Sequence, residues 1–193
     1  MECKKLGAVS KALALATAIG IGLSTAAEAR TLKVQTSSTA SHFTLAFLNE
    51  HWVPRLKEMT GGSLEIELLP IRAVVPHRET PEAVSMGILD GDLTSINYFA
   101  GRDPSFALMG DLIAGYDSAD QIQAFCANGG GKEMLQKLFD KFQPGVKVVG
   151  CGAYAREAFV SKVPINSVDE LKGVKVRSPE GLAAEGDQPL AAQ

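Results

Sequence analysis

Residues 31–69, TLKVQTSSTASHFTLAFLNEHWVPRLKEMTGGSLEIELL, decide the fold because they predict a strand, a long helix and a second strand in succession. Apolar and polar residues alternate in Leu32–Thr36 and again in Ser63–Leu69, as they do in half-buried strands. Between them, apolar residues recur at spacings of three and four from about His42 to Met59. That period indicates a helix with one apolar face.

The ends of this helix also carry signals. Ser41 is expected to cap its start, since serine accepts hydrogen bonds from the first free backbone N–H groups. Gly61 and Gly62 are typical of a left-handed helix end. Pro54 lies inside the pattern and predicts a kink or a break, because proline has no N–H to donate.

The chain then repeats the alternation of helix and strand. Thr80 and Pro81 predict the start of a helix that runs to Asp90, with threonine as its cap and proline in its first turn. Leu93–Phe99 predicts a third strand. With right-handed crossovers, this order indicates an open α/β sheet with helices on both faces.

Further elements follow towards the C-terminus. Ser118–Ala127 and Gly131–Phe142 predict two helices, and Val146–Cys151 predicts a strand that begins a second domain. A single helical turn is expected at Val168–Lys172, after the capping residue Ser167. The last predicted strand is Val174–Arg177.

The first 29 residues predict a secretory signal peptide. Lys4, Lys5 and Lys11 make a positive start, Ala12–Leu23 is uncharged and mostly apolar, and Ala27–Ala29 supplies small residues for cleavage near Ala29. The apolar run is shorter than the about 20 residues that a membrane-spanning helix needs. A periplasmic or freely secreted protein is therefore favoured over an uncleaved anchor or a buried helix.

Charge and cysteine content narrow the classes of partner. The chain of 193 residues has 19 basic and 22 acidic residues and a net charge of −3, which argues against nucleic acids and anionic membranes. Beyond the signal peptide, Cys126 and Cys151 either pair in an oxidising compartment or remain as two buried thiols, and their spacing leaves both open. The scattered histidines and cysteines predict no metal site.

Motifs for catalysis are missing from the sequence. It contains no G-x-S-x-G, no H-E-x-x-H and no G-x-x-x-x-G-K-[ST] pattern. The run Gly129–Lys132 lacks the preceding strand that a phosphate-binding loop needs. We therefore predict no catalytic residue, no cofactor and no enzyme, with a small secreted hydrolase as the remote alternative.

A binding function has more support. Open α/β sheets bind ligands at the carboxyl ends of their strands, and Tyr98, Arg156 and Arg177 follow or end predicted strands. The planar guanidinium of arginine holds a carboxylate through two parallel hydrogen bonds, so two converging arginines would orient a small anion. The alternative is that the arginines are solvated surface residues and that the tyrosine covers the core.

Four stretches of the mature chain resemble the periplasmic solute-binding subunits of tripartite ATP-independent periplasmic (TRAP) transporters, the DctP-like family. The stretches are MTGGSLEIELLP (59–70), PEAVSMGILDGDLTSINYFAGRDPSFALMGDL (81–112), GGGKEMLQKLF (129–139) and PINSVDELKGVKVRSPEGLAAE (164–185). The second stretch is most similar to the branch that binds small 2-oxo or hydroxy monocarboxylates. The last stretch is the most specific.

The resemblance implies roles for three residues. Arg177, in the K-x-R-x-P element, would form the main salt bridge to the substrate carboxylate, and Tyr98 would line the cleft. The register places Arg156 where the oxo-acid branch usually has a glutamine that helps to hold a bridging metal ion. Branches that bind sialic acid or dicarboxylates have arginine there. Because an arginine repels a cation, its presence at this position argues against the metal-bridged mode.

The resemblance also implies the architecture and the partners. The fold would be α/β, a periplasmic binding protein-like fold of two lobes that close about a hinge near Gly145. Residues 30–145 would form the first lobe, largely present, and residues 146–185 the start of a truncated second lobe, with 186–193 as a tail unlike the family. We expect a receptor in the periplasm for a small organic carboxylate, with TRAP membrane subunits as partners. The truncation implies weak or absent binding by this chain alone, and a non-functional fragment is the alternative.

Overall fold

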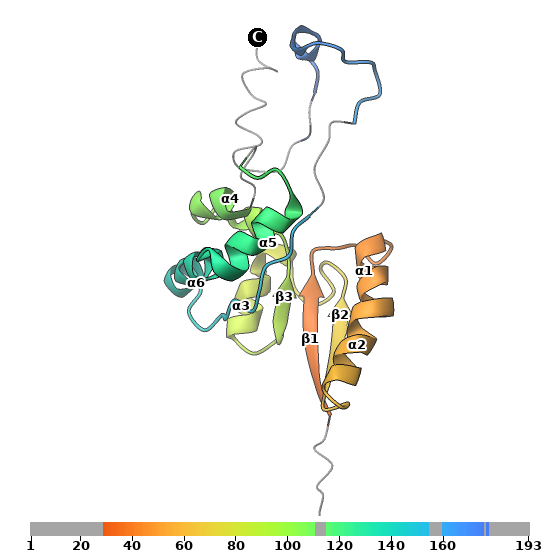
Figure 1. The fold of residues 1–193 in the computed structure, drawn as a ribbon, viewed down its shortest axis with the longest axis vertical. Helices are drawn as coiled ribbons and strands as arrows, with labels where there is room; N and C mark the ends of the chain where they lie inside the picture. Colours follow the sequence, from red (N-terminus) through yellow and green to blue (C-terminus); the bar gives the residue numbers. More distant parts are fainter. Residues whose placement is uncertain (1–28, 111–114, 155–159, 176, 178–193) are drawn as a thin grey trace, which may run out of the picture.

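The computed structural model describes residues 29–110, 115–154, 160–175 and 177 (Figure 1). Three strands form one parallel sheet in the order β2-β1-β3. The strands are β1 (Arg30–Thr36), β2 (Leu64–Leu69) and β3 (Gly91–Leu93). A parallel sheet with intervening helices confirms the α/β class. The signal-peptide prediction falls on residues that lie almost wholly outside the described ones.

The helices surround this sheet. In chain order they are α1 (Phe43–Phe47), the π-helix η1 (Leu48–Trp52), α2 (Val53–Met59), the 3-10 helix η2 (His77–Glu79), α3 (Thr80–Ser85), the 3-10 helix η3 (Ile96–Phe99), α4 (Ser105–Gly110), α5 (Ala119–Asn128), α6 (Gly131–Phe142) and the 3-10 helix η4 (Val168–Leu171). In Figure 1, α1 and α2 lie beside β1 and β2, whereas α3, α5 and α6 lie on the side of β3. Among the described helices, none has the length and apolarity needed to span a membrane.

The first long helix forms, with two differences from its prediction. Its N-cap is His42 rather than Ser41, and the Nδ1 atom of His42 accepts a hydrogen bond from the Thr44 N–H. The helix does not break at Pro54. Instead, the preceding turns widen into η1, where the Val53 N–H donates to the Leu48 carbonyl. The wider turn accommodates the proline ring, which would otherwise press on the carbonyl four residues earlier.

The predicted helix to Asp90 and strand Leu93–Phe99 are both wrong in extent. The helix α3 ends at Ser85, because Gly87 takes the left-handed conformation (φ 72°) that closes a helix. Thr80, expected as its cap, is instead its first residue and is buried. The strand β3 begins at Gly91, where an added Cβ would lie 3.1 Å from the Val34 side chain on β1.

The residues after β3 turn into η3 and contribute to the core instead of extending the sheet. Phe99 packs with Phe106 of α4 and Phe139 of α6, with ring centroids 5.8 Å and 6.2 Å from the Phe99 ring. Leu135 and Val148 complete this buried cluster. Burial of these large side chains outweighs the strand propensity of the segment, so the third strand stays short.

The helices α5 and α6 agree with their predictions. The Ser118 hydroxyl accepts a hydrogen bond from the Gln121 N–H at the start of α5. Gly131–Phe142 is helical over the predicted range. Near the end of α6, the Arg102 guanidinium forms an ion pair with Glu82 of α3 and donates to the Gln143 side chain at 3.2 Å. These contacts join α3 to α6.

The predicted strands at Val146–Cys151 and Val174–Arg177 are not observed. Residues 146–151 are irregular, and so are 174, 175 and 177 of the second run. A strand exists only through its pairing with a neighbour, and in the described part of the chain neither run has a strand partner. The predicted turn at Val168–Lys172 forms as the 3-10 helix η4, and Gly173 ends it with φ 76°.

Candidate ligand-binding site

The carboxyl ends of the three parallel strands lie at one edge of the sheet, and the loops that leave them are joined by hydrogen bonds. The Ser37 N–H, after β1, donates to the Leu93 carbonyl at the end of β3, at 3.1 Å. The Ile71 N–H, after β2, donates to the Ser38 carbonyl at 2.8 Å. The loops after all three strands therefore form one connected surface, which we call the carboxyl edge. This is where open α/β sheets bind ligands.

Gln35 fixes the loop between β2 and α3. Its side chain is polar but has no exposed surface. The Oε1 atom accepts from the N–H groups of Val74 (2.8 Å) and Val75 (3.2 Å). The Nε2 atom donates to the Val75 carbonyl (3.0 Å) and to the Thr80 hydroxyl (2.9 Å). One buried amide thus satisfies backbone groups that no strand or helix pairs, and it positions the loop at the carboxyl edge.

Tyr98 lies close to the carboxyl edge, on η3 rather than at the end of a strand. Its side chain is partly exposed, and its ring meets the His77 ring edge-on, with centroids 4.9 Å apart. His77 precedes α3 in the sequence and Tyr98 follows it, so the two rings meet only in the folded chain. Together they present a partly apolar wall with a phenol hydroxyl and an imidazole.

Arg72 is a further cation at this edge that the sequence pattern does not single out. It lies in the loop after β2, is exposed, and has φ 64°. Among the described residues it is the one non-glycine residue with positive φ. This conformation costs a side-chain-bearing residue about 1–2 kcal/mol. The only sequence signal was an arginine three residues past a predicted strand, which is common on protein surfaces.

Asp92 lies in the centre of β3, opposite Gln35 of β1 in the parallel register. Burial raises the pKa of its carboxyl group to about 7, because removing the charged form from water is unfavourable. Two polar atoms in the residues that follow β3, the Thr94 hydroxyl oxygen and the Asn97 Oδ1 atom, are buried and lack a hydrogen-bond partner in the described structure. The base of the carboxyl edge beside β3 is therefore poorly solvated.

The structure does not test the two arginines predicted to bind the ligand. Arg156 lies outside the described residues. Arg177 is exposed on an irregular segment. Figure 1 shows residues 160–175, which lead to it, well away from the sheet. The structure therefore brings Tyr98 to the carboxyl edge, with His77 and Arg72, and leaves the role of the arginines as a prediction.

Metal donors do not gather in the described part of the chain. No group of three or more histidine, cysteine, aspartate or glutamate side chains is placed there to hold a metal ion. Cys126 and Cys151 are joined in a disulfide, so of the two pairing states left open by the sequence, the bonded one is observed. Neither thiol is then available as a nucleophile or as a ligand.

The family model for bacterial extracellular solute-binding proteins, family 7 (DctP), matches residues 34–186. A TRAP periplasmic solute-binding protein from Rhodobacter sphaeroides, solved in an apo open state, is 39% identical, with a TM-score of 0.68. That match covers 83% of this chain and 50% of the Rhodobacter chain. The present chain thus spans half the length of this relative.

Two other proteins are similar. A monocarboxylate 2-oxoacid-binding periplasmic protein from Nostoc is 31% identical over 134 residues, which are 68% of this chain and 35% of the relative. A TRAP solute-binding protein from Colwellia psychrerythraea, solved with bound calcium and pyruvate, has a TM-score of 0.61 at 21% identity. The match covers 84% of this chain and 49% of the Colwellia chain. At 21% identity it shows a similarity of fold alone.

These similarities agree with the architecture described above. The matched proteins are solute-binding receptors rather than enzymes, which excludes the hydrolase alternative. The family is described as extracellular. The disulfide between Cys126 and Cys151 is consistent with this location, because disulfides persist in oxidising compartments. The chain belongs to the bacterial extracellular solute-binding protein family 7, the DctP family.

Proposed function

We propose that the protein is the periplasmic receptor of a TRAP transporter and captures a small organic carboxylate for import through TRAP membrane subunits. The observation that carries this proposal is the 39% identity, over 83% of the chain, to a TRAP periplasmic solute-binding protein. The Nostoc relative, a monocarboxylate 2-oxoacid-binding protein, supports a monocarboxylate as the solute. Residues 1–29 would direct export and be removed near Ala29.

In this proposal the first lobe supplies the wall of the site and the second supplies the anion contacts. Tyr98, held against His77, would line the cleft at the carboxyl edge. Arg177 would neutralise the carboxylate through a bidentate pair, and Arg156 would orient it. Closure of two lobes about the ligand would favour the closed state through contacts that only this state provides.

A bridging metal ion does not fit the residues proposed for the site. A guanidinium at position 156 repels a cation, and the described residues provide no cluster of anionic or imidazole donors. We therefore propose that the carboxylate is held by the arginines directly.

The test uses a chimaera, because the chain spans half of the Rhodobacter relative. Residues 30–185 of this protein are joined to the remaining C-terminal part of that receptor. Pyruvate, lactate, succinate and sialic acid are titrated by calorimetry, with and without EDTA. We expect binding of a monocarboxylate that EDTA does not change. Arg177→Lys should weaken it roughly 10- to 100-fold, since a bidentate charge-assisted pair is lost.

The matched control is Lys175→Ala, which removes a neighbouring cation two residues away. It should leave the affinity unchanged. A folded chimaera that binds none of the four compounds would refute the proposed function. Equal effects of the two variants would refute the role of Arg177. The chain without the added part is titrated alongside and should bind weakly or not at all, because many closing contacts come from the second lobe.

A further inference from the structure

The segment after α6 leads out of the first lobe, and three separate contacts fasten it to that lobe. It consists of residues 146–151, which are irregular in conformation. Fastened segments of this kind move with the body to which they are attached. The position of the last contact therefore decides where the chain can begin to bend.

The first contact is made by Gln136 of α6, whose side chain pairs with the backbone of the segment. Its Nε2 atom donates to the Val146 carbonyl at 2.9 Å, and its Oε1 atom accepts from the Val148 N–H at 2.8 Å. This amide occupies the carbonyl and N–H that a neighbouring strand would otherwise pair. The same Nε2 atom donates to Asp140 at 2.8 Å, which holds the amide in this orientation.

The second contact is the Val148 side chain. It is buried in the main core cluster, together with Phe99, Phe106 and Phe139. Val146, at the start of the segment, packs against the same cluster and is partly buried, whereas Lys147 and Val149 are exposed. Displacing the segment would expose the apolar Val148 side chain to water, which is unfavourable.

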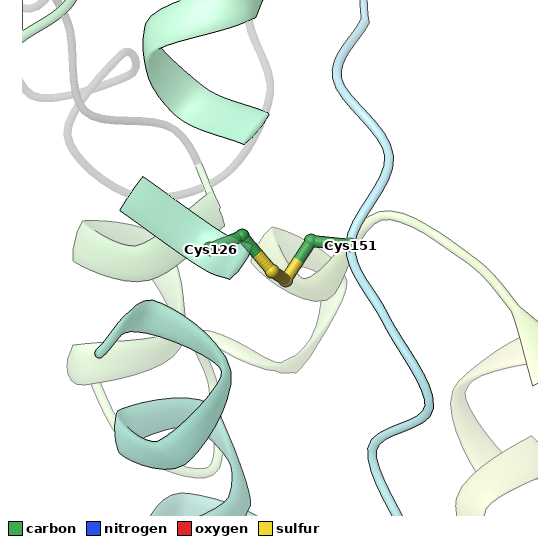
Figure 2. Close-up of a disulfide and its surroundings, with 2 residues drawn as sticks. All are labelled: Cys126 and Cys151. Carbon is green, nitrogen blue, oxygen red and sulfur yellow. A yellow bond between two sulfur atoms is a disulfide. The ribbon is translucent and has the colours of Figure 1, made fainter. Parts of the chain in front are cut away.

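The third contact is the disulfide between Cys126 of α5 and Cys151 (Figure 2). Figure 2 shows Cys126 projecting from the helix towards the passing segment, which carries Cys151. The two Cα atoms are 6.1 Å apart. Because Cys126 is buried, the covalent bond ties position 151 to the interior side of α5.

We propose that these three contacts form a clamp and that the pivot between the lobes lies after Cys151, starting at Gly152, instead of at Gly145. Gly145 lies before the clamp, and the nearest atom to its added Cβ is the Ser85 Cβ, at 3.7 Å. Gly152 has no atom within 4 Å of the corresponding position among the described residues. The first lobe then extends to residue 151, and the disulfide is its outer boundary.

The description of this point as a pivot rests on the proposed receptor function, whereas the clamp can be tested without any ligand. Trypsin cleaves after lysine and requires a locally extended, released chain. Lys147 and Lys162 are both exposed, but Lys147 lies inside the clamp and Lys162 beyond it. In the oxidised full chain we expect cleavage after Lys162 to be at least about tenfold faster than cleavage after Lys147. Before Lys147 can be cleaved, two hydrogen bonds and the packed side chains of Val146 and Val148 must be released.

Two perturbations should release Lys147. Gln136→Leu removes both backbone pairings, and a phosphine reductant opens the disulfide of the unaltered chain. Each should speed cleavage after Lys147, the first by roughly tenfold. The matched control, Gln123→Leu on the exposed face of α5, should change nothing. Lys141 within α6 reports global unfolding and should remain uncut in every sample.

The outcomes separate the clamp from the receptor function. Equal cleavage after Lys147 and Lys162 in the oxidised chain would overturn the clamp. So would an unchanged rate after Lys147 in both perturbed samples while Lys141 remains intact. A chimaera that binds no carboxylate would overturn the receptor function and leave the cleavage pattern as predicted.

Discussion

Replacement of Gln35 by leucine should lower the stability of the first lobe strongly, because this one side chain holds several backbone groups. The leucine keeps the approximate volume of the side chain but removes all four hydrogen bonds of the amide. The N–H groups of Val74 and Val75 and the Val75 carbonyl then lose their side-chain partner. Thr80 still donates to the His77 carbonyl and is affected least.

The magnitude follows from those three backbone groups. A buried polar group without a partner costs about 1–3 kcal/mol. Val74 is 45% exposed, so water can reach part of this loop, and the lower end of that range applies to each group. We therefore expect a loss of about 3 kcal/mol, slightly offset by burial of the more apolar leucine.

The assay is urea unfolding of the mature chain followed by circular dichroism, with the free energy of unfolding extrapolated to water. The matched control is Gln123→Leu on the exposed face of α5, which should change stability by less than about 0.5 kcal/mol. A Gln35→Leu variant within 1 kcal/mol of this control, with an unchanged m-value, would refute the inference that Gln35 holds the loop.

Three other perturbations test separate features. Because burial raises the Asp92 pKa from 3.8 to about 7, the folded state binds the extra proton between these values, and stability should fall as pH rises from 4 to 7. Asp92→Asn should remove this slope and stabilise the protein at pH 8 by up to about 4 kcal/mol; parallel pH profiles in urea unfolding would contradict it. Arg72→Gly should raise stability by about 0.5–1 kcal/mol by relieving the left-handed conformation, and a lower melting temperature would contradict this. Reduction of the Cys126–Cys151 disulfide, which closes a loop of sequence separation 25, should cost about 3 kcal/mol in unfolding free energy, and equal stability of both forms would contradict it.

Local patterns predicted the elements whose causes are local. The helix α6 forms over its predicted range, since its apolar period is contained in a dozen residues. Strands β1 and β2 also agree closely with their alternating runs. The errors lie where distant contacts decide. The segment after β3 has strand propensity, but Phe99 packs in a cluster with Phe106 of α4 and with Phe139 of α6, and Phe139 lies far along the chain.

The candidate site divides in the same way. Tyr98 is predicted from its position at the end of an expected strand, although it lies on η3, and its contact with a ligand stays a prediction. Gln35 and His77 could not be found from local patterns. Gln35 appears as an ordinary polar residue of a half-buried strand, and its importance comes from partners about 40 residues away. Likewise, no spacing rule links His77 to the ring that it meets.

The sequence by itself determined the class of fold, the order of the first strands and helices, and the family. These depend on periodicity and on short motifs, which involve residues that are close together in the sequence. Only the tertiary structure decided that Cys126 and Cys151 pair and that the Gln136 side chain pairs with the backbone of Val146 and Val148. The physical reason is that a backbone group or a thiol is satisfied by whichever partner the packed chain brings within reach.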